Sequence, residues 1–248
     1  MGKLNGKVAV ITGGASGIGR GVAQLYAREG AAVGIFDLDE EGARKVATEI
    51  ASGGGRAAIA TGDVSKEEDV KAGLRSLVSE LGRVDIMVNN AGIDTTAELD
   101  GMSTEMWDRM IAVHLRGTFL CTREVLPEMK RKKWGRIINL SSQLAHKGAP
   151  TMVHYVAAKS GIMGFTRALA YEVARDGITV NCVNPGPINT PLLEGLPQDW
   201  LERKKNELPI GRFGEVSEVA PVFLLLASDE GSYFIGASLN VNGGDYMI

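Results

Sequence analysis

Residues 7–19 read KVAVITGGASGIG, and this stretch decides the fold. Its first six residues form a short, largely β-branched apolar run, which is typical of a buried parallel strand. A glycine-rich turn comes next, and a helical pattern then continues to Glu29. Glycines let the backbone turn tightly and approach a pyrophosphate, while the helix N-terminus offers unpaired N–H groups to the phosphates. Since a tight turn without a ligand has the same local pattern, the dinucleotide interpretation depends on the second predicted strand. The dinucleotide interpretation assigns five loop residues to the cofactor: Gly13, Ser16, Gly17, Ile18 and Gly19.

That second strand, residues 32–36 (AVGIF), ends at Asp37, 18 residues after Gly19. This is about where dinucleotide folds place the acid that binds the adenosine ribose hydroxyls. A carboxylate there repels a 2′-phosphate, and the loop position that could offset the repulsion holds Ser16 rather than a cation. We therefore expect NAD(H) to be preferred over NADP(H). The alternative is that Asp37 is a surface residue at the start of the next helix.

Strand and helix patterns alternate along the rest of the chain. This alternation predicts a single-domain α/β fold over residues 1–248: a Rossmann-type, doubly wound, seven-stranded parallel sheet with helices on both faces. One long helix is expected over 104–132, with Thr104 as its N-cap, and another over 153–175. The further strands are expected at 56–60, 85–88, 136–140, 178–184 and 238–241.

Composition narrows the class of protein. The 248 residues carry a net charge of −3, so no basic footprint for nucleic acid is expected. No apolar run approaches the ~18 residues that a membrane span needs. Cys121 and Cys182 lie far apart in apolar segments without metal-ligand spacing, so we expect no metal site and interpret them as buried thiols in a reducing compartment. A cytoplasmic protein is expected.

A second motif joins Ser142 to the pair Tyr155 and Lys159. The i, i+4 spacing of the pair places the phenol and the ammonium on one face of a helix. A phenol with a pKa near ~10 exchanges protons poorly at neutral pH unless a cation favours its phenolate, and Lys159 is placed to be that cation. Ser142 could hydrogen-bond the same substrate oxygen. A structural Tyr–Lys pair has the same spacing, so this motif needs the context of the others.

Taken together, these motifs closely resemble the short-chain dehydrogenase/reductase family over nearly the whole chain. The resemblance implies hydride transfer between a nicotinamide and a carbonyl carbon, with Tyr155 as general acid/base and Ser142 polarising the substrate oxygen. Lys159 would hold the ribose hydroxyls and lower the Tyr155 pKa. It also implies a homotetramer, with helices near 104–132 and 153–175 at one interface. Besides the loop, Asp37, Tyr155 and Lys159, the residues assigned to the cofactor are Asp63, Val64, Asn90, Ala91, Gly92, Pro185, Gly186, Ile188 and Thr190.

One position departs from the family pattern. Where the family usually has Asn in V-N-L-x-G, residues 113–117 read VHLRG, so His114 stands at the position that helps hold a water in the proton relay. We hypothesise that His114 serves the relay and that His114→Asn leaves activity broadly intact. The alternative is a histidine that only packs between helices.

Within the family, the chain is most similar to the 3-oxoacyl-[acyl-carrier-protein] reductases, notably in residues 226–230 and 241–247. Two features count against a housekeeping fatty-acid role. Asp37 favours NAD, whereas those reductases mostly use NADPH. They also dock an acidic carrier protein through basic residues; Lys133 fits, but Asp176 falls where a second cation is expected, with Arg175 beside it.

The function expected is therefore an NAD(H)-dependent oxidoreductase of ketones and secondary alcohols, with 3-oxoacyl thioesters of acyl carrier protein or coenzyme A as the best substrates. An alternative is catabolic oxidation of a cyclic alcohol, polyol or hydroxy acid, for which Gln143 and His154 could bind a polar substrate. Residues 187–208 are expected to be a substrate lid, although a plain surface helix has the same pattern. A non-catalytic NAD-binding regulator is the third interpretation, and the intact Ser142, Tyr155 and Lys159 set speaks against it.

Overall fold

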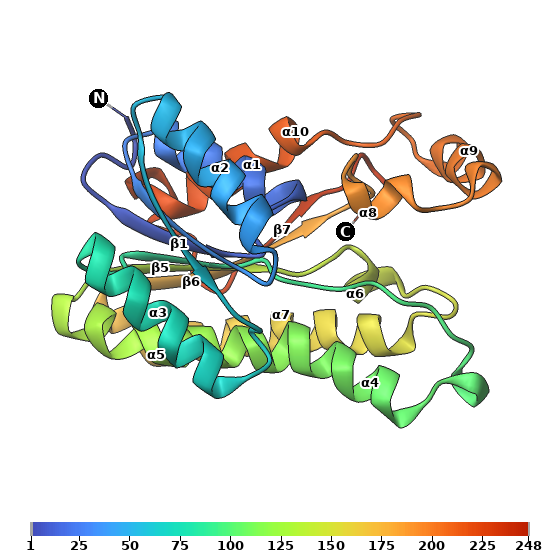
Figure 1. Cartoon of the computed structure of the whole chain (residues 1–248). Coiled ribbons are helices and arrows are strands. Elements are labelled where there is room, and N and C mark those ends of the chain that lie inside the picture. Colours follow the sequence, from blue (N-terminus) through green and yellow to red (C-terminus); the bar gives the residue numbers. More distant parts are fainter. Residues whose placement is uncertain (1, 248) are drawn as a thin grey trace.

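The computed structural model describes residues 2–247, with Met1 and Ile248, the ends of the predicted domain, outside the described residues (Figure 1). Seven parallel strands form one sheet in the order β3-β2-β1-β4-β5-β6-β7, which confirms the predicted Rossmann-type α/β fold. The strands are β1 (Val8–Thr12), β2 (Ala32–Asp37), β3 (Arg56–Thr61), β4 (Ile86–Asn89), β5 (Gly135–Leu140), β6 (Ile178–Pro185) and β7 (Ser238–Val241).

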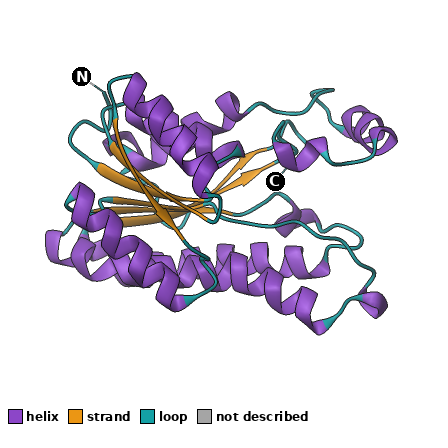
Figure 2. Cartoon of the chain, viewed as in Figure 1, coloured by secondary structure: helices purple, strands orange, loops and turns teal. Residues whose placement is uncertain are grey.

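Helices cover both faces of the sheet (Figures 1 and 2). On one face lie α1, α2 and α10; on the other lie α3, α5 and α7. The helices are α1 (Gly17–Arg28), α2 (Glu40–Ser52), α3 (Glu67–Leu81), α4 (Thr104–Ile111), α5 (Gly117–Lys132), α6 (Leu144–Lys147), α7 (Val153–Val173), α8 (Pro191–Glu194), α9 (Gln198–Glu207) and α10 (Val216–Ala227). Short helical turns occur at η1 (Leu99–Gly101), η2 (Ala112–Arg116), η3 (Ala174–Asp176) and η4 (Asp229–Gly231).

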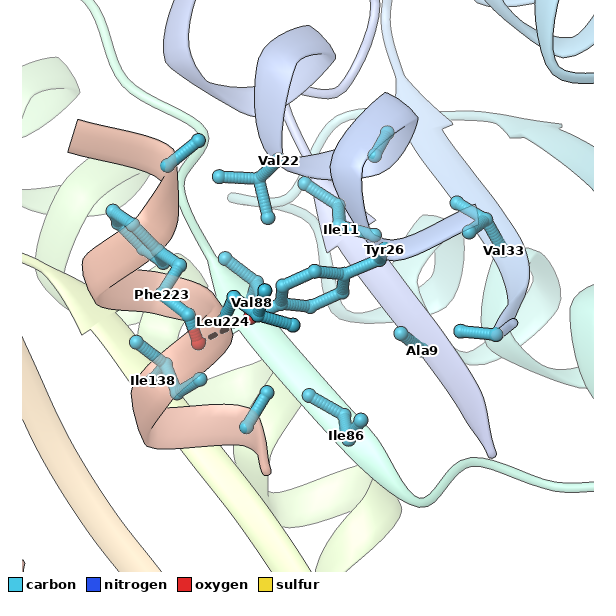
Figure 3. Packing of buried hydrophobic residues seen from close by; sticks show 14 of the residues in the cluster. Ala9, Ile11, Val22, Tyr26, Val33, Ile86, Val88, Ile138, Phe223 and Leu224 are labelled. Atoms are coloured by element: carbon cyan, nitrogen blue, oxygen red, sulfur yellow. Dashed lines mark hydrogen bonds between the residues drawn. The ribbon is translucent and has the colours of Figure 1, made fainter. Parts of the chain in front are cut away.

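Each face of the sheet has its own apolar core because a parallel sheet must be covered on both sides. Figure 3 shows the core under α1 and α10, where Tyr26 packs among Ile11, Val22 and Phe223. The Tyr26 hydroxyl donates a hydrogen bond to the Phe223 carbonyl (2.8 Å), so its buried oxygen is satisfied. This core fixes the helix after the glycine loop against the sheet.

The helix expected over 104–132 is interrupted. A π-helical turn, η2, separates α4 from α5, and the N-cap is Ser103 rather than Thr104, because the Ser103 Oγ accepts a hydrogen bond from the Met106 N–H (3.2 Å). A π-turn holds an extra residue per turn and is frequent at functional sites. Here it contains His114.

The strand order reverses direction between β1 and β4, which are neighbours in the sheet. Ligands of doubly wound sheets bind at this switch point, beyond the carboxyl ends of the strands. The glycine loop comes after β1, Asn90 after β4 and Ser142 after β5. The topology therefore brings the separate sequence motifs to one edge of the sheet.

Candidate active site

A cavity of about 500 Å³ opens at this edge. The glycine loop forms part of its wall, and so do Tyr155 and Lys159 of α7. Of the residues assigned from sequence, the cavity wall contains Gly13, Ser16, Gly17, Ile18, Asp37, Asp63, Val64, Asn90, Ala91, Gly92, His114, Tyr155, Lys159 and Thr190.

Other assigned residues lie outside this wall. Gly19 packs behind the loop against Gly13. Pro185 ends β6, and the Gly186 N–H donates to the Val241 carbonyl (3.0 Å). Ile188 is buried in the core under α1 and α10, where its backbone forms a bridge with Gly214. Their assignment to the cofactor remains a prediction.

The two substrate candidates are also buried outside the wall. The Gln143 amide donates to Asp245, and His154 Nε2 lies 2.9 Å from Thr95 Oγ1. One atom of each, Gln143 Oε1 and His154 Nδ1, is buried without a hydrogen-bond partner. Ser142 is likewise outside the wall, but it is a polar neighbour of Tyr155 that acts to lower the Tyr155 pKa.

The loop after β1 depends on glycine for its backbone conformation. Gly13 has φ +64°, and a Cβ there would lie 2.8 Å from the Ala91 Cα. A side chain at this position would therefore be strained and would collide with Asn90 and Ala91 after β4. The Asn90 amide donates to the Thr12 and Gly13 carbonyls (3.0 and 2.9 Å), which ties the loop to the end of β4. The residues present fit a dinucleotide.

Two carboxylates stand at the glycine-loop end of the cavity, where an adenosine would lie. Asp37 Oδ2 accepts a hydrogen bond from the Ala15 N–H (2.9 Å), so the carboxylate is held against the glycine loop. Asp63 forms an ion pair with Arg109 (2.8 Å), so the positive charge of Arg109 is already balanced. Burial acts to raise the pKa of Asp63, but hydrogen bonds from Ser65 and Arg109 outweigh it and leave the pKa lowered. The charged groups described at this end of the cavity are thus the Asp37 and Asp63 carboxylates and the Arg109 guanidinium, which is already paired with Asp63.

At the reacting end, the Ser142 hydroxyl is a polar neighbour of the Tyr155 phenol. The Leu144 N–H donates to Ser142 Oγ (3.1 Å), which leaves the serine hydroxyl hydrogen free to point elsewhere. Burial raises the pKa of Tyr155 to about 12, and the neighbouring Ser142 lowers it only in part. The sequence interpretation expects the opposite direction, a lowered pKa. The difference arises because removing the phenolate from water outweighs its polar neighbours.

Lys159 is almost fully buried. Its Nζ lies 5.6 Å from the centre of the Tyr155 ring and donates to the Leu140 carbonyl (2.7 Å). Burial lowers the pKa of this ammonium to about 7, against the opposing effect of Asp94. With a pKa of about 7, this lysine is divided between its charged and neutral forms near neutral pH.

His114 packs edge-on against Tyr155, with the ring centres 5.4 Å apart. Its Nε2 lies 2.8 Å from the Ile93 carbonyl oxygen, and its Nδ1 is buried without a partner. Burial first, and then Lys159, lower its pKa well below the ordinary value, so the ring is neutral at neutral pH. Gly92 makes room for it: a Cβ there would lie 2.5 Å from His114 Cε1.

Sequence reasoning missed two polar residues at the site. Arg109 reaches the cavity from α4, 46 positions away from its partner Asp63 along the chain, and no local pattern indicates that pairing. Asp94 comes just after β4 and the Asn-Asn-Ala-Gly motif of residues 89–92, so its closeness to that motif is a signal that could have found it. The Asp94 Oδ1 is buried without a hydrogen-bond partner.

Comparison with known proteins gives a consistent assignment. A family model described as enoyl-(acyl carrier protein) reductase matches residues 13–245. The chain is 40% identical to the 3-oxoacyl-[acyl-carrier-protein] reductase FabG of Thermotoga maritima over 242 residues, which covers 98% of each chain. It is 41% identical over 241 residues to the (2S)-[(R)-hydroxy(phenyl)methyl]succinyl-CoA dehydrogenase subunit BbsD of Thauera aromatica, with 97% of each chain covered. FabG of Staphylococcus aureus is 38% identical over 242 residues, 97% of this chain and 98% of its own. The chain therefore belongs to the short-chain dehydrogenase/reductase family of oxidoreductases.

Proposed function

We propose that this protein is an NAD(H)-dependent oxidoreductase that interconverts 3-oxoacyl and 3-hydroxyacyl thioesters. The observation that carries the proposal is the cavity that joins the glycine loop and Asp37 at one end to Tyr155 and Lys159 at the other. A dinucleotide held by these residues would have its nicotinamide near the phenol. Lys159 and Tyr155 would hold the nicotinamide ribose, and the loop of residues 13–19 the diphosphate.

The reaction divides between the cofactor and the chain. When bound, the dinucleotide supplies a hydride to the carbonyl carbon in reduction and accepts one in oxidation. Tyr155 donates its proton to the carbonyl oxygen as that oxygen gains charge, and Ser142 donates a hydrogen bond to the same atom. A phenol with a pKa of about 12 is protonated at neutral pH, which suits this donor role in reduction. Lys159, with a pKa of about 7, then restores the proton to Tyr155.

His114 is proposed to hold the relay between Lys159 and solvent. Its neutral ring is fixed by Ile93 and leaves Nδ1 without a partner beside Tyr155. It is a positioning residue here, since it acts on the proton supply and not on the substrate. His114→Asn is expected to leave turnover broadly intact, and a large gain would show that the histidine impairs the relay.

We propose that the enzyme prefers NAD(H) to NADP(H) because of the charged side chains near the glycine loop, where the adenosine would bind. A 2′-phosphate would meet the Asp37 carboxylate, and the nearby Arg109 is already paired with Asp63. Like charges in such proximity cost several kcal/mol.

A thioester substrate is proposed because of the names of two relatives. One is a 3-oxoacyl-[acyl-carrier-protein] reductase, and the other is by its name a dehydrogenase of a hydroxy(phenyl)methylsuccinyl-CoA. Coenzyme A thioesters are favoured over carrier-protein thioesters, because the Lys133 ammonium that would meet an acidic carrier is paired with Asp176. Residues 187–208, which contain α8 and α9, are proposed to be the lid over the acyl chain. The cytoplasm is the proposed location, in keeping with two free, buried cysteines.

A second candidate is dehydrogenation of a small polar alcohol, favoured by the buried and unpartnered atoms of Gln143 and His154 near the reacting end. One absorbance assay separates the two. NADH and NADPH would each be followed with acetoacetyl-CoA, ethyl acetoacetate and butanone, and NAD⁺ with a panel of polyols and cyclic alcohols. The proposal expects NADH with acetoacetyl-CoA to give the highest kcat/KM. Preference for NADPH, or for a polyol, would contradict the cofactor or the substrate assignment respectively.

A further inference from the structure

The segment after β4 is held at its two ends by different elements. At its start, the Asn90 and Ala91 N–H groups both donate to Thr12 Oγ1 at the end of β1 (3.0 and 3.1 Å). Further along, the Ala97 N–H donates to the Thr151 carbonyl, two residues before α7 begins (2.9 Å). Figure 1 shows this segment, in green, passing the start of α7 on its way to α4. The segment therefore leads from the cavity wall to the helix that carries the reacting groups.

Two histidines hold the middle of this segment. His114 Nε2 lies 2.8 Å from the Ile93 carbonyl oxygen and 3.1 Å from the Ile93 nitrogen. His154 Nε2 lies 2.9 Å from Thr95 Oγ1. Every second residue from Ile93 to Ala97 thus makes a contact with η2, with α7 or with the turn before α7. The part of the segment at the cofactor cavity and the part at α7 are fixed by separate contacts.

His154 is a buried side chain whose polar contact is with Thr95. It is fully buried and directly precedes Tyr155 on α7. Among residues 2–247, its other ring nitrogen, Nδ1, has no hydrogen-bond partner. An apolar side chain would avoid the cost of that unpaired nitrogen, so the contribution of the imidazole at this position is its hydrogen bond with Thr95. This is a role different from the direct substrate contact considered from the sequence.

The residue that receives the Ala97 N–H is strained. Thr151 has φ +62°, in the left-handed region that a β-branched residue rarely adopts. Such a conformation persists where the surrounding contacts hold it, and it is found most often at functional sites. The strain is a second observation, independent of the Thr95–His154 contact, that the junction between the segment and α7 has one fixed geometry.

We propose that Thr95 and His154 are positioning residues that hold the segment from Thr95 to Ala97 as a wall of the substrate site beside Tyr155. The inference rests on the proposed function, because the wall serves the ketone that Tyr155 protonates. The segment leaves the cavity wall after Ile93 and ends against the turn before α7, so a ketone at the phenol has it alongside. His154 acts on the substrate through Thr95 and the backbone that Thr95 fixes.

The two anchors separate the effect on substrate from the effect on cofactor. Thr12 holds Asn90 and Ala91 whether or not Thr95 keeps its contact with His154. Loss of that contact should therefore raise the KM for the ketone and leave NADH binding unchanged. The loss of one hydrogen bond corresponds to a change of roughly three- to tenfold.

The test compares Thr95→Val with Thr95→Ser. Thr95 is exposed, so neither change disturbs the core. Valine keeps the shape of threonine without its hydroxyl, and serine keeps the hydroxyl. Thr95→Val should raise the KM for acetoacetyl-CoA roughly three- to tenfold with little change in kcat, whereas Thr95→Ser should stay close to wild type. NADH binding, measured by nicotinamide fluorescence, should be the same in all three proteins. Thr104→Val, at an exposed threonine of α4, is the matched control and should leave every value unchanged.

A second readout needs neither cofactor nor turnover. Amide hydrogen exchange at Ala97 should be faster in Thr95→Val than in wild type and Thr95→Ser. An unchanged KM in Thr95→Val would overturn the inference and leave the proposed function standing. If wild type shows no turnover, the proposed function falls and exchange decides the rest: faster exchange in Thr95→Val alone would leave the positioning role standing, and equal exchange would overturn it as well.

Discussion

At the scale of single residues, the site depends on what burial does to charge. Tyr155 and Lys159 are one helical turn apart on α7, yet burial moves the pKa of the phenol up to about 12 and that of the ammonium down to about 7. Both shifts favour the neutral forms, because each charged form loses its hydration. Polar neighbours such as Ser142 and Asp94 decide how far the shifts go.

Asp37 gives the sharpest residue-scale prediction on cofactor choice. Asp37→Ser should raise the preference for NADPH relative to NADH by roughly tenfold or more, since the like-charge repulsion of a 2′-phosphate is removed. The ratio of the two kcat/KM values measures this change. Asp39→Ser is the control, because Asp39 caps α2 through the Gly42 N–H (3.0 Å) and is not in the cavity wall. Unchanged discrimination in Asp37→Ser would remove Asp37 from cofactor selection.

At the scale of elements, the proposed lid is tied to the C-terminal segment. Lys204 of α9 and Lys147 of α6 both contact the Asp245 carboxylate, at 2.8 and 2.7 Å, and Gln143 donates to it as well. Burial acts to raise the pKa of Asp245, but the hydrogen bonds from these side chains outweigh it and lower the pKa. One carboxylate thus joins three segments around the reacting end.

Asp245→Asn is expected to loosen α9. The change leaves two lysines without their shared anion and should cost about 1–3 kcal/mol of stability, with faster amide hydrogen exchange in residues 198–207 than in α10. Because the Asp245 pKa is lowered on folding, its contribution is present above the ordinary carboxyl pKa and is lost as pH falls through the folded value. The wild-type and variant stabilities should therefore converge in acid. Equal exchange in α9 of wild type and variant at neutral pH would contradict the tether.

The elements also show how far the sequence predicts the structure. Every strand is predicted to within one or two residues, because buried β-branched runs and glycine turns are local signals. The break between α4 and α5 is not predicted, since a π-turn preserves the helical pattern of side chains. The pairing of Arg109 with Asp63 and the raised pKa of Tyr155 are products of packing between distant segments, and no local pattern encodes them.

At the scale of the whole molecule, apolar side chains remain exposed on the helices predicted to meet in a homotetramer. Phe119 of α5 is 41% exposed and Tyr171 of α7 is 91% exposed. Exposed apolar patches mark protein–protein contacts. Among residues 2–247, no helix is long and apolar enough to cross a membrane. Among the described side chains of that range, which leave out Glu194, no three or more potential metal ligands are grouped.

The protein is expected to elute as four chains by light scattering coupled to size exclusion. Phe119→Glu should reduce the measured mass, because it places a charge in the proposed contact. Val78→Glu alters a side chain of α3 that is also exposed (40%) but lies outside the proposed contact, so it should leave the mass unchanged. A wild-type protein with the mass of one chain would contradict the assembly.

The most direct test of the central claim is NADH oxidation with acetoacetyl-CoA by wild type and by Tyr155→Phe, alongside NADH binding by both. The phenylalanine variant keeps the ring and the packing against His114 but has no proton to give. We predict turnover by wild type, a loss of at least ~100-fold in the variant, and NADH binding in both. Turnover retained in Tyr155→Phe would show that the proton comes from another group and would contradict the site described above.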